Sequence, residues 1–218
     1  MEGTKEMAKK ISPVETRSPI VEELIQENVG KFMTRTVTHY HIGIATEIKG
    51  SFLKFERASW IAETGAFGKT CAEGALKEFE NFKYPVWVNI KSIVDFTDYP
   101  FDLQYDKSFG KGESYTIPKN TPIPITGRNP FEDFLGEQVL TRTVTHYHVG
   151  RVKEVRNMFV VLEDATWIAD TGPFGKTCAN GEIKEFENFK YPVRVNLDAI
   201  VDFCAWPFTL PVLNKKSK

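Results

Sequence analysis

The chain has 218 residues, and 41% of them are hydrophobic, which is enough to fill the core of one large or two small domains. Its 28 lysines and arginines nearly balance 29 acidic residues, so no global positive charge exists to attract nucleic acid or an anionic membrane. The start is polar, and no segment approaches the run of about 20 apolar residues that spans a bilayer. We therefore expect a cytoplasmic protein without a membrane partner.

The chain contains an internal repeat. An offset of 107 residues aligns Thr34 with Thr141 and runs without a gap to Leu103 and Leu210, and 44 of the 70 aligned residues are identical. Two units at this spacing indicate two copies of one domain rather than a solenoid. The predicted organisation is a flexible N-terminal tail (1–17), repeat 1 (18–103), a linker rich in Gly, Pro, Lys and Thr (104–128), repeat 2 (129–213) and a basic tail (214–218).

Each repeat opens with the signature of a short helix. In repeat 1, Ser18 is the expected N-cap and Gly30 lies beyond the helix end. In repeat 2, Asn129 and Gly136 occupy the same roles. We therefore predict one short helix before each set of strands.

Two strands follow in each repeat. Residues 34–48 are dense in Thr, Val, Tyr and Ile, and we expect one long strand that bends or bulges at Gly43, with Gly150 as the counterpart in repeat 2. Residues 51–62 predict a second, buried strand.

A short helical insert comes next, in the sequences TGAFGKTCAEG and TGPFGKTCANG. In the second, Thr171 or Gly172 is the expected cap and Gly181 the terminator. In the first, we expect one helix face to pack inward and the other to face water. The inward residues are Phe67, Cys71 and Ala72, and the outward ones are Lys69 and Thr70.

The GKT within this insert is shared with phosphate-binding loops, but the rest of that motif is missing. The motif GxxxxGK[ST] needs a first glycine that makes a tight turn toward the phosphates. Here that position is Glu63 or Asp170, whose carboxylate would repel the ligand. The insert therefore does not predict a nucleotide hydrolase.

Two more strands, at 77–82 and 86–96, complete the repeat. If the long strand bends at its glycine, it can belong to two sheets, and the simplest way to close them is a small five-stranded barrel. The sequence therefore predicts a mainly β protein with two homologous small barrels, each having a preceding short helix and a short helical insert.

This element order resembles that of the Sm- and Hfq-like small barrels, which implies two Sm/SH3-like β-barrels here. The acidic and Arg-Gly loop signatures of Sm proteins are absent, since the corresponding loops read IKGSF and FKYPV. RNA binding of the Sm type is therefore not favoured.

A second resemblance is closer, because it involves specific sequence motifs. The motif RTVT…WIADTG…AIVD…LP is similar to that of a family of small phage-encoded proteins of unknown role, which usually have a single copy; it covers residues 35–103 and 142–211. The resemblance implies a tandem duplication of that domain, a viral origin and a location in the host-cell cytoplasm. It implies nothing about chemistry.

All four histidines lie in two identical THYH runs, as His39 and His41 in repeat 1 and His146 and His148 in repeat 2. Residues two apart on a strand share a face, so each pair would present two imidazoles side by side. The nearest carboxylate on the same strand face, Glu47, is roughly 20 Å along the strand, too far to complete a metal site. We therefore predict no metal and no cofactor.

No catalytic constellation accompanies the histidines, because the sequence shows neither a serine elbow nor a cysteine near a histidine. The three cysteines have no CxxC spacing, and we expect them as free buried thiols. The chain is therefore predicted not to be an enzyme.

The leading hypothesis is a non-enzymatic oligomeric binding and assembly protein, in which small open barrels join edge to edge into a ring or larger multimer. Sites between the units would bind an anionic small ligand such as a nucleotide. The candidate ligand-binding residues are His39, Tyr40, His41, Thr64 and Lys69 in repeat 1, and His146, Tyr147, His148, Thr171 and Lys176 in repeat 2. One alternative is a virion structural or decoration protein that binds virion proteins; another is an Sm-like RNA-binding protein, which the near-neutral charge disfavours.

Overall fold

The computed structural model of the protein describes residues 29–103 and 116–211. The N-terminal tail, most of the helix expected before repeat 1, part of the linker and the basic tail fall outside these ranges. Within them the fold is mainly β, as the sequence predicts, and the strands join in one 13-stranded sheet. None of the helices in these ranges has both the length and the apolar character needed to span a bilayer.

The two repeats contain the same elements in the same order. Repeat 1 has β1 (Gly30–Thr36), β2 (Tyr40–Lys49), β3 (Phe52–Glu63), α2 (Phe67–Glu73), β4 (Glu78–Asn81), β5 (Val86–Asn89), the 3₁₀ helix η1 (Ile90–Ser92) and β6 (Ile93–Asp98). Repeat 2 has the 3₁₀ helix η2 (Pro130–Phe134), β8 (Gln138–Thr143), β9 (Tyr147–Arg156), β10 (Phe159–Asp170), α4 (Phe174–Asn180), β11 (Glu185–Asn188), β12 (Val193–Asn196), the 3₁₀ helix η3 (Leu197–Ala199) and β13 (Ile200–Ala205).

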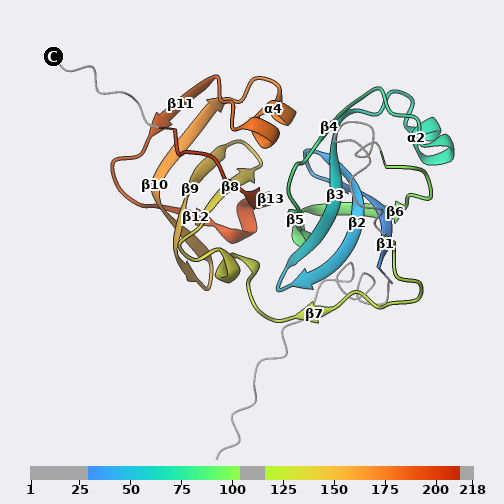
Figure 1. Cartoon of the computed structure of the whole chain (residues 1–218), viewed down its shortest axis with the longest axis horizontal. Helices are drawn as coiled ribbons and strands as arrows, with labels where there is room; N and C mark the ends of the chain where they lie inside the picture. The colour runs from blue at the N-terminus through green and yellow to red at the C-terminus, as the bar shows by residue number, and fades with distance from the viewer. Residues whose placement is uncertain (1–28, 104–115, 212–218) are drawn as a thin grey trace, which may run out of the picture.

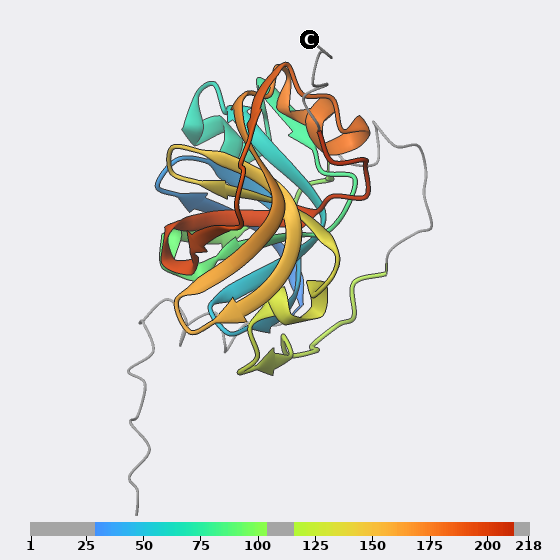
Figure 2. The same cartoon turned by 90° about the vertical axis from the view of Figure 1, so that its left-hand side faces the viewer.

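The two halves lie side by side and share one sheet (Figure 1). Strands of repeat 1 follow the order β6-β1-β2-β3-β5, and those of repeat 2 the order β13-β8-β9-β10-β12, with the short strands β4 and β11 added to β3 and β10. The halves join where β5 pairs antiparallel with β13. Figure 2, which faces repeat 2, shows how strongly its long strands curve.

The two separate closed barrels expected from the sequence are not observed. The hydrogen-bonded path of the sheet runs from β11 to β6 and does not return on itself. The reason is that the free edge of β5 pairs with β13 of the other half rather than with β6 of its own half. The strong curvature is present, but the sheet remains open.

The long strand predicted at 34–48 is two antiparallel strands, β1 and β2, joined by a turn. The Thr36 N–H donates to the His39 carbonyl over 2.8 Å, and the Thr36 hydroxyl accepts from the His39 N–H over 3.0 Å. Thr143 and His146 make the same turn between β8 and β9. Threonine side-chain bonds to the backbone favour such turns over a continuous strand.

Gly43 does mark an irregularity, as predicted. The register between β2 and β3 shifts between Ile42 and Ile44. A Cβ at Gly43 would lie only 3.1 Å from the Cβ of Phe55, so glycine permits the close approach of the two strands.

The last predicted strand is also divided. The Asn89 side chain accepts a hydrogen bond of 3.0 Å from the Lys91 N–H and caps η1, which separates β5 from β6. Asn196 caps η3 in the same way. An asparagine side chain that satisfies a free N–H starts a helical turn at the point where the strand would otherwise continue.

The predicted helices that fall within the described residues are present, and only the inserts start at residues other than the expected caps. The helix before repeat 2 is the 3₁₀ helix η2, and the Asn129 side chain accepts from the Phe131 N–H over 3.1 Å. The inserts α2 and α4 end at Gly74 and Gly181, both in the left-handed conformation with φ of 68° and 73°. Neither has a side-chain cap at its start, which is Ala66 in α2 and Pro173 in α4 rather than Thr171 or Gly172.

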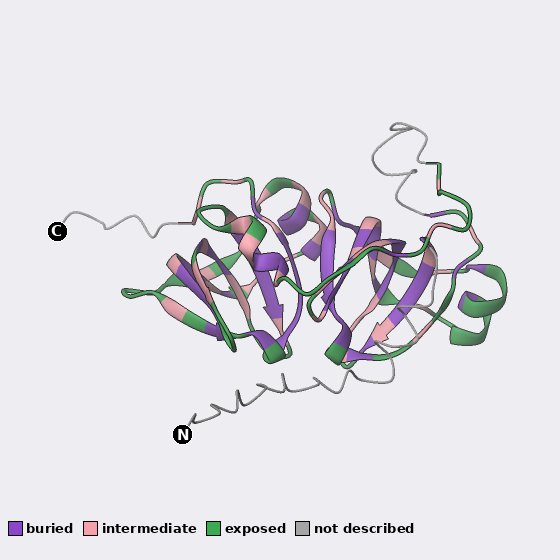
Figure 3. Ribbon diagram, turned by 90° about the horizontal axis from the view of Figure 1, so that it is seen from below, coloured by how far each residue is buried: buried purple, intermediate pink, exposed green. Residues whose placement is uncertain are grey.

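The hydrophobic core is continuous across the two halves. One buried cluster consists mainly of repeat 1 residues but includes Phe174, Cys178 and Cys204 from repeat 2. A second consists mainly of repeat 2 residues but includes Phe52 and Trp87 from repeat 1. Each half therefore has a cluster that residues of the other half complete, and the contact between the halves is part of the interior (Figure 3).

Part of the linker is ordered against repeat 1. The short strand β7 (Ile125–Thr126) pairs in parallel with the end of β2, and Ile123 is buried. The linker thus packs on the sheet it follows before the chain enters repeat 2.

Candidate functional site: the seam between the repeats

The contact between β5 and β13, which we call the seam, is held by backbone and side-chain hydrogen bonds. Asp202 lies opposite Val88 and Phe203 opposite Trp87 in the antiparallel register. The buried Asn89 amide donates to the carbonyls of Leu197 (3.1 Å) and Ile200 (2.9 Å) on the other half. Because these donors and acceptors are buried, each bond spares a group from the cost of lying unpaired away from water.

A charged group from repeat 2 meets a histidine of repeat 1 at the centre of the seam. The Arg142 Nε donates to both oxygens of Asp202, at 3.0 and 3.1 Å, and Arg142 Nη2 also bonds to this carboxylate. The His41 Nε2 lies 2.7 Å from Asp202 Oδ2 and 3.0 Å from Arg142 Nη2. All three side chains are almost completely buried. Residues 101 and 161 positions apart along the chain thus form one polar group.

Aromatic rings enclose this group. The Arg142 guanidinium lies 4.8 Å from the ring centre of Phe174 and 5.7 Å from that of Trp60. His41 stacks on Phe82, with 6.2 Å between ring centroids. The rings exclude water and give the cation favourable ring faces, so the pairing of Arg142 with Asp202 acts in a low-dielectric environment.

Burial and charge set the protonation states at the seam. Burial lowers the pKa of His41, despite the adjoining Asp202, so the imidazole is neutral at neutral pH. Burial by itself would raise the pKa of Asp202, but the charge and hydrogen bonds of Arg142 and the contact with His41 together outweigh it, so the pKa lies well below its usual range. The group is therefore an ion pair with a neutral histidine beside it.

The short helix α4 of repeat 2 contributes another contact. The Gly175 N–H, in its first turn, donates to the Glu80 carboxylate of β4 over 2.6 Å. Burial raises the pKa of Glu80, and the bond from Gly175 opposes this. In Figure 1, α4 lies between the two halves beside β4, whereas α2 lies at the outer edge of repeat 1.

The seam is therefore a closed structure rather than an open cleft. Within the described part of the chain, Arg142 Nη1 and His41 Nδ1 are buried without a hydrogen-bond partner. No group of three or more His, Cys, Asp or Glu that could hold a metal ion occurs in residues 29–103 and 116–211. Its chemistry is that of a specific, desolvated contact between two surfaces.

The predicted histidines divide between the seam and the surface. His41 is in the seam, and His39 lies in the turn before β2, with its ring 5.5 Å from that of Trp60. Burial, followed by the charge of Arg142, lowers the pKa of His39 to about 3. The first histidine of each pair belongs to a turn, because β2 and β9 begin only at Tyr40 and Tyr147.

In repeat 2 the rings of the equivalent histidines contact aromatic rings of their own half, Trp167 and Phe189. The rings of His146 and His148 are 6.4 Å apart. His146 is exposed and His148 is half-buried. Burial, with a smaller contribution from His146, lowers the pKa of His148 to about 4.

The other predicted residues surround the short helices. Tyr40 stacks beside Phe67 with 6.0 Å between centroids, and Tyr147 lies beside Phe174 at 5.8 Å. The Thr64 and Thr171 hydroxyls donate to the carbonyl of the glycine that follows each of them, over 3.3 and 2.8 Å. The two lysines, Lys69 and Lys176, are exposed.

Two predicted roles within the inserts are wrong. Phe67, Cys71 and Ala72, expected to pack inward, are exposed, because no neighbour covers α2 in the described structure. Thr70, expected to face water, is buried, and its hydroxyl donates to the carbonyls of Thr64 (3.2 Å) and Ala75 (2.7 Å). The threonine therefore fixes the loop around the helix.

Sequence reasoning missed the two residues that define the seam, Arg142 and Asp202. A signal was present, since an arginine and an aspartate occur at equivalent places in both repeats, as Arg35 and Asp95 in repeat 1. The spacing of 60 residues between them gives no indication of pairing until β8 and β13 are known to be neighbours.

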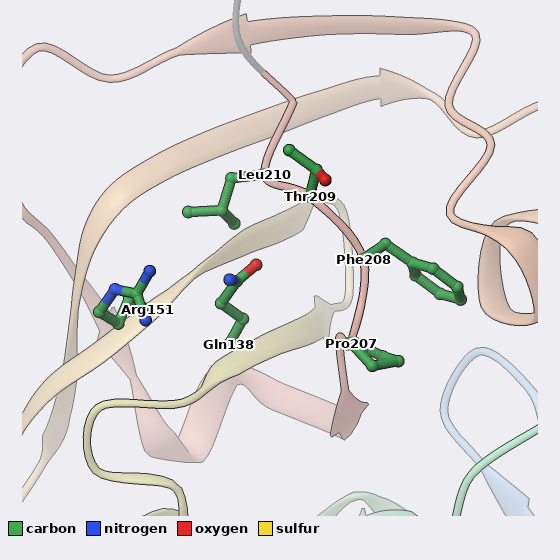
Figure 4. A pocket seen from close by; sticks show the side chains of 6 residues that line it. All are labelled: Gln138, Arg151, Pro207, Phe208, Thr209 and Leu210. Carbon is green, nitrogen blue, oxygen red and sulfur yellow. The ribbon is translucent and has the colours of Figure 1, made fainter.

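A separate shallow depression of about 470 Å³ lies on repeat 2 (Figure 4). Its lining residues are Gln138, Arg151, Pro207, Phe208, Thr209 and Leu210. None of the predicted site residues lines it. Arg151 Nη1 donates to the Gly136 carbonyl over 2.8 Å, so one of its donor groups is already used by the protein itself.

Comparison of the chain with protein-family models, curated proteins and solved structures gives no match.

Proposed function

We propose that the protein is a non-enzymatic binding and assembly protein. In this proposal, two homologous small Sm-like barrels associate edge to edge into a ring or larger multimer and hold an anionic small ligand, such as a nucleotide, near the seams. The observation that carries it is the seam, where a strand edge of one repeat is completed by the other around a buried ion pair.

The topology of each half supports the barrel assignment. In both halves the last strand of the repeat lies beside the first, and the strand before the last, β5 or β12, lies at the opposite border. The orders are β6-β1-β2-β3-β5 and β13-β8-β9-β10-β12. Strong curvature with borders left open is the form that a small incomplete barrel takes. An open strand border needs a second strand to pair with, and at the seam β13 is the strand that pairs with the border of repeat 1.

The composition of the seam supports a role in recognition rather than catalysis. His41 and Asp202 are adjacent, as in many catalytic groups, but their neighbour is an arginine and not a nucleophile. All three side chains are shielded from solvent, so a substrate cannot reach them while the halves are joined. A buried, mutually paired network of this kind specifies which surfaces associate.

The ligand part of the proposal rests on exposed groups at the rim of the seam. Lys176 is exposed and directly follows Gly175, whose N–H binds Glu80 across the seam. Lys83 is also exposed, and its Nζ lies 3.4 Å from the Ala179 carbonyl of α4. The Lys83 Nζ also lies 5.7 Å from the ring centre of Tyr84. An ammonium group beside an aromatic ring, with the second ammonium group of Lys176 on the helix α4, suits an anion with a flat ring, which is the chemistry of a nucleotide.

Native mass spectrometry of freshly purified full-length protein tests both parts, because it reports the mass of the assembly and of any retained small molecule. We expect a discrete multimer, and added ATP, used as a nucleotide probe, should bind more weakly to a Lys176→Ala variant. A monomer at micromolar concentration would contradict the assembly, and no retained molecule together with no ATP binding would contradict the ligand.

A further inference from the structure

The outer ends of the two halves carry the same aromatic residues as the seam, but there they are exposed. Phe67 is 39% exposed, whereas its equivalent Phe174 at the seam is 5% exposed. Phe189 is 39% exposed, whereas its equivalent Phe82 at the seam is 3% exposed. The local sequences are nearly the same, so the difference comes from the neighbour that each position has or lacks.

One of these outer surfaces, which we call the β6 end, already has the geometry of the repeat 2 side of the seam. Arg35 Nη2 is bonded to the Asp95 carboxylate, as Arg142 Nη2 is bonded to that of Asp202. The Arg35 guanidinium lies 5.7 Å from the ring centre of Phe67, as the seam arginine lies 4.8 Å from Phe174. The β6 end therefore has the ion pair and the aromatic ring of the seam but lacks the imidazole.

The opposite outer surface, the β12 end, has the geometry of the repeat 1 side. His148 stacks on Phe189 with 6.0 Å between centroids and 26° between ring planes. At the seam, His41 stacks on Phe82 at 6.2 Å and 22°. The β12 end therefore has the imidazole and its supporting ring but lacks the ion pair.

We propose that the β12 end of one molecule binds the β6 end of a second copy, and so forms between molecules the seam that each molecule contains between its repeats. This inference rests on the proposed function, because it names the partner and the surfaces of the assembly. His148 would take the place of His41, and Arg35 with Asp95 of the second copy would complete the buried polar group.

The backbone edges support this contact. Among the described residues, β6 pairs only with β1 and β12 only with β10, so each leaves one edge open. Transfer of the β5–β13 register places Val195 opposite Asp95 and Arg194 opposite Phe96 of the second copy. Trp87 and Phe203, which stack at the seam, are thus replaced by a guanidinium on an aromatic ring, a favourable cation–π pair.

At one position the two repeats carry opposite charges, Lys91 in repeat 1 and Asp198 in repeat 2, which favours the seam and the proposed contact between molecules. At the seam, Lys91 Nζ lies 2.8 Å from Asp198 Oδ1. These two residues occupy equivalent positions in the repeats, so the same contact between molecules places Asp198 of one copy near Lys91 of the next, each beside its existing partner within its own molecule. Had both repeats kept the same residue, like charges would face each other at every contact.

The contact is head to tail, since the two ends are different surfaces. Repetition of such a contact produces a ring if the rotation between copies closes, and a filament otherwise. Either form gives each added molecule one β6 end and one β12 end to use. Blocking one end of a molecule should therefore leave the other end functional.

This property provides a sharp test with two variants of the full chain. Phe67→Glu places a charge on the β6 end, and Phe189→Glu places one on the β12 end. Both side chains are already exposed in the single molecule, so each variant is expected to fold, which circular dichroism and thermal melting would check. Ile125→Glu is the matched control, because Ile125 is also 39% exposed but lies on β7, which pairs with β2.

Native mass spectrometry and size-exclusion chromatography with light scattering give the readout. We expect wild type and Ile125→Glu to form the multimer, and each phenylalanine variant alone to be monomeric, with self-association weakened by about 100-fold or more. An equimolar mixture of the two variants should form a one-to-one dimer and nothing larger, because it restores one intact contact.

The outcomes separate the inference from the proposed function. A wild-type monomer at micromolar concentration would overturn both the assembly and this contact. A wild-type multimer that persists in both phenylalanine variants would overturn this contact alone, as would a mixture that stays monomeric.

Discussion

The helices α2 and α4 share the sequence FGKTCA, yet they have opposite environments. In α4, Phe174 and Cys178 are buried and Gly175 bonds to Glu80 of the other half. In α2, Phe67 and Cys71 are exposed. The same residues are thus part of a core in one place and of a surface in the other, so sequence identity alone does not decide burial.

The ion pairs that accompany these helices differ in the same way. Arg142 and Asp202 are desolvated and enclosed by aromatic rings, whereas Arg35 and Asp95 are largely exposed. A buried pair is costly to break, because the remaining charge cannot be solvated; an exposed pair contributes little. The repeats therefore offer a matched internal control for each residue of the seam, provided that the chain is kept monomeric by Phe189→Glu.

The largest effect is expected from removal of the buried carboxylate. Asp202→Ala leaves Arg142 without its partner and should lower the free energy of unfolding by about 3–5 kcal/mol. Asp95→Ala in the monomeric background should lower it by at most about 1 kcal/mol. Urea denaturation measures both, and equal losses at the two positions would contradict the comparison.

Truncation of the aromatic ring at each helix tests the same comparison between the buried and the exposed copy. Phe174→Ala removes a buried ring from the surroundings of Arg142 and should cost about 3 kcal/mol. Phe67→Ala in the monomeric background should change the free energy of unfolding by no more than about 0.5 kcal/mol. Thermal and chemical denaturation of the two variants would show whether the seam, and not the helix itself, makes the difference.

Acidification should weaken the seam through His41, which lies against Asp202 and Arg142. Because the pKa of His41 is lowered in the folded chain, the unfolded chain binds a proton first as the pH falls below the ordinary value of 6.5. The contribution of His41 is thus fully present above pH 6.5 and declines below it, by at most about 2 kcal/mol at pH 5. Denaturation at pH 7 and pH 5 should show a smaller loss for His41→Gln than for wild type; a loss of the same size would exclude this role.

The smallest expected effects have opposite signs at two equivalent glycines. A Cβ at Gly175 would lie 2.9 Å from the Cβ of Glu80, so Gly175→Ala should destabilise the chain by about 1–2 kcal/mol. A Cβ at Gly68 meets nothing within 4 Å, so Gly68→Ala in the monomeric background should stabilise it by about 0.5–1 kcal/mol through helix propensity. Changes of the same sign in thermal melting would refute the proposed origin of the asymmetry.

Much of the fold could be predicted from local patterns. The second strand at 51–62, the short inserts and their terminal glycines follow from side-chain alternation and from residues that favour particular turns. The turns within 34–48 and 86–96 were missed, because Thr36 and Asn89 break these strands through single hydrogen bonds to the backbone. Such bonds leave little trace in a pattern dominated by β-branched residues.

The site was predicted only in part. His41 was identified as a candidate contact residue, and it does lie where the repeats meet. Its partners Arg142 and Asp202 could not be identified, because they come from two strands of the other half that are 60 residues apart in sequence. The depression beside Gln138 and Arg151 was not predicted, because its remaining lining residues, 207–210, lie more than 50 residues further along the chain.

The sequence by itself determined that the chain is rich in strands, that its halves share one pattern, and where its short helices stop. These properties depend on neighbours close in the chain. Only the tertiary structure decided which copy of each shared residue is buried, because burial depends on the surface that faces it. The pairing of β5 with β13 gives Phe174, Arg142 and Asp202 such a surface, and leaves Phe67, Arg35 and Asp95 without one in the described molecule.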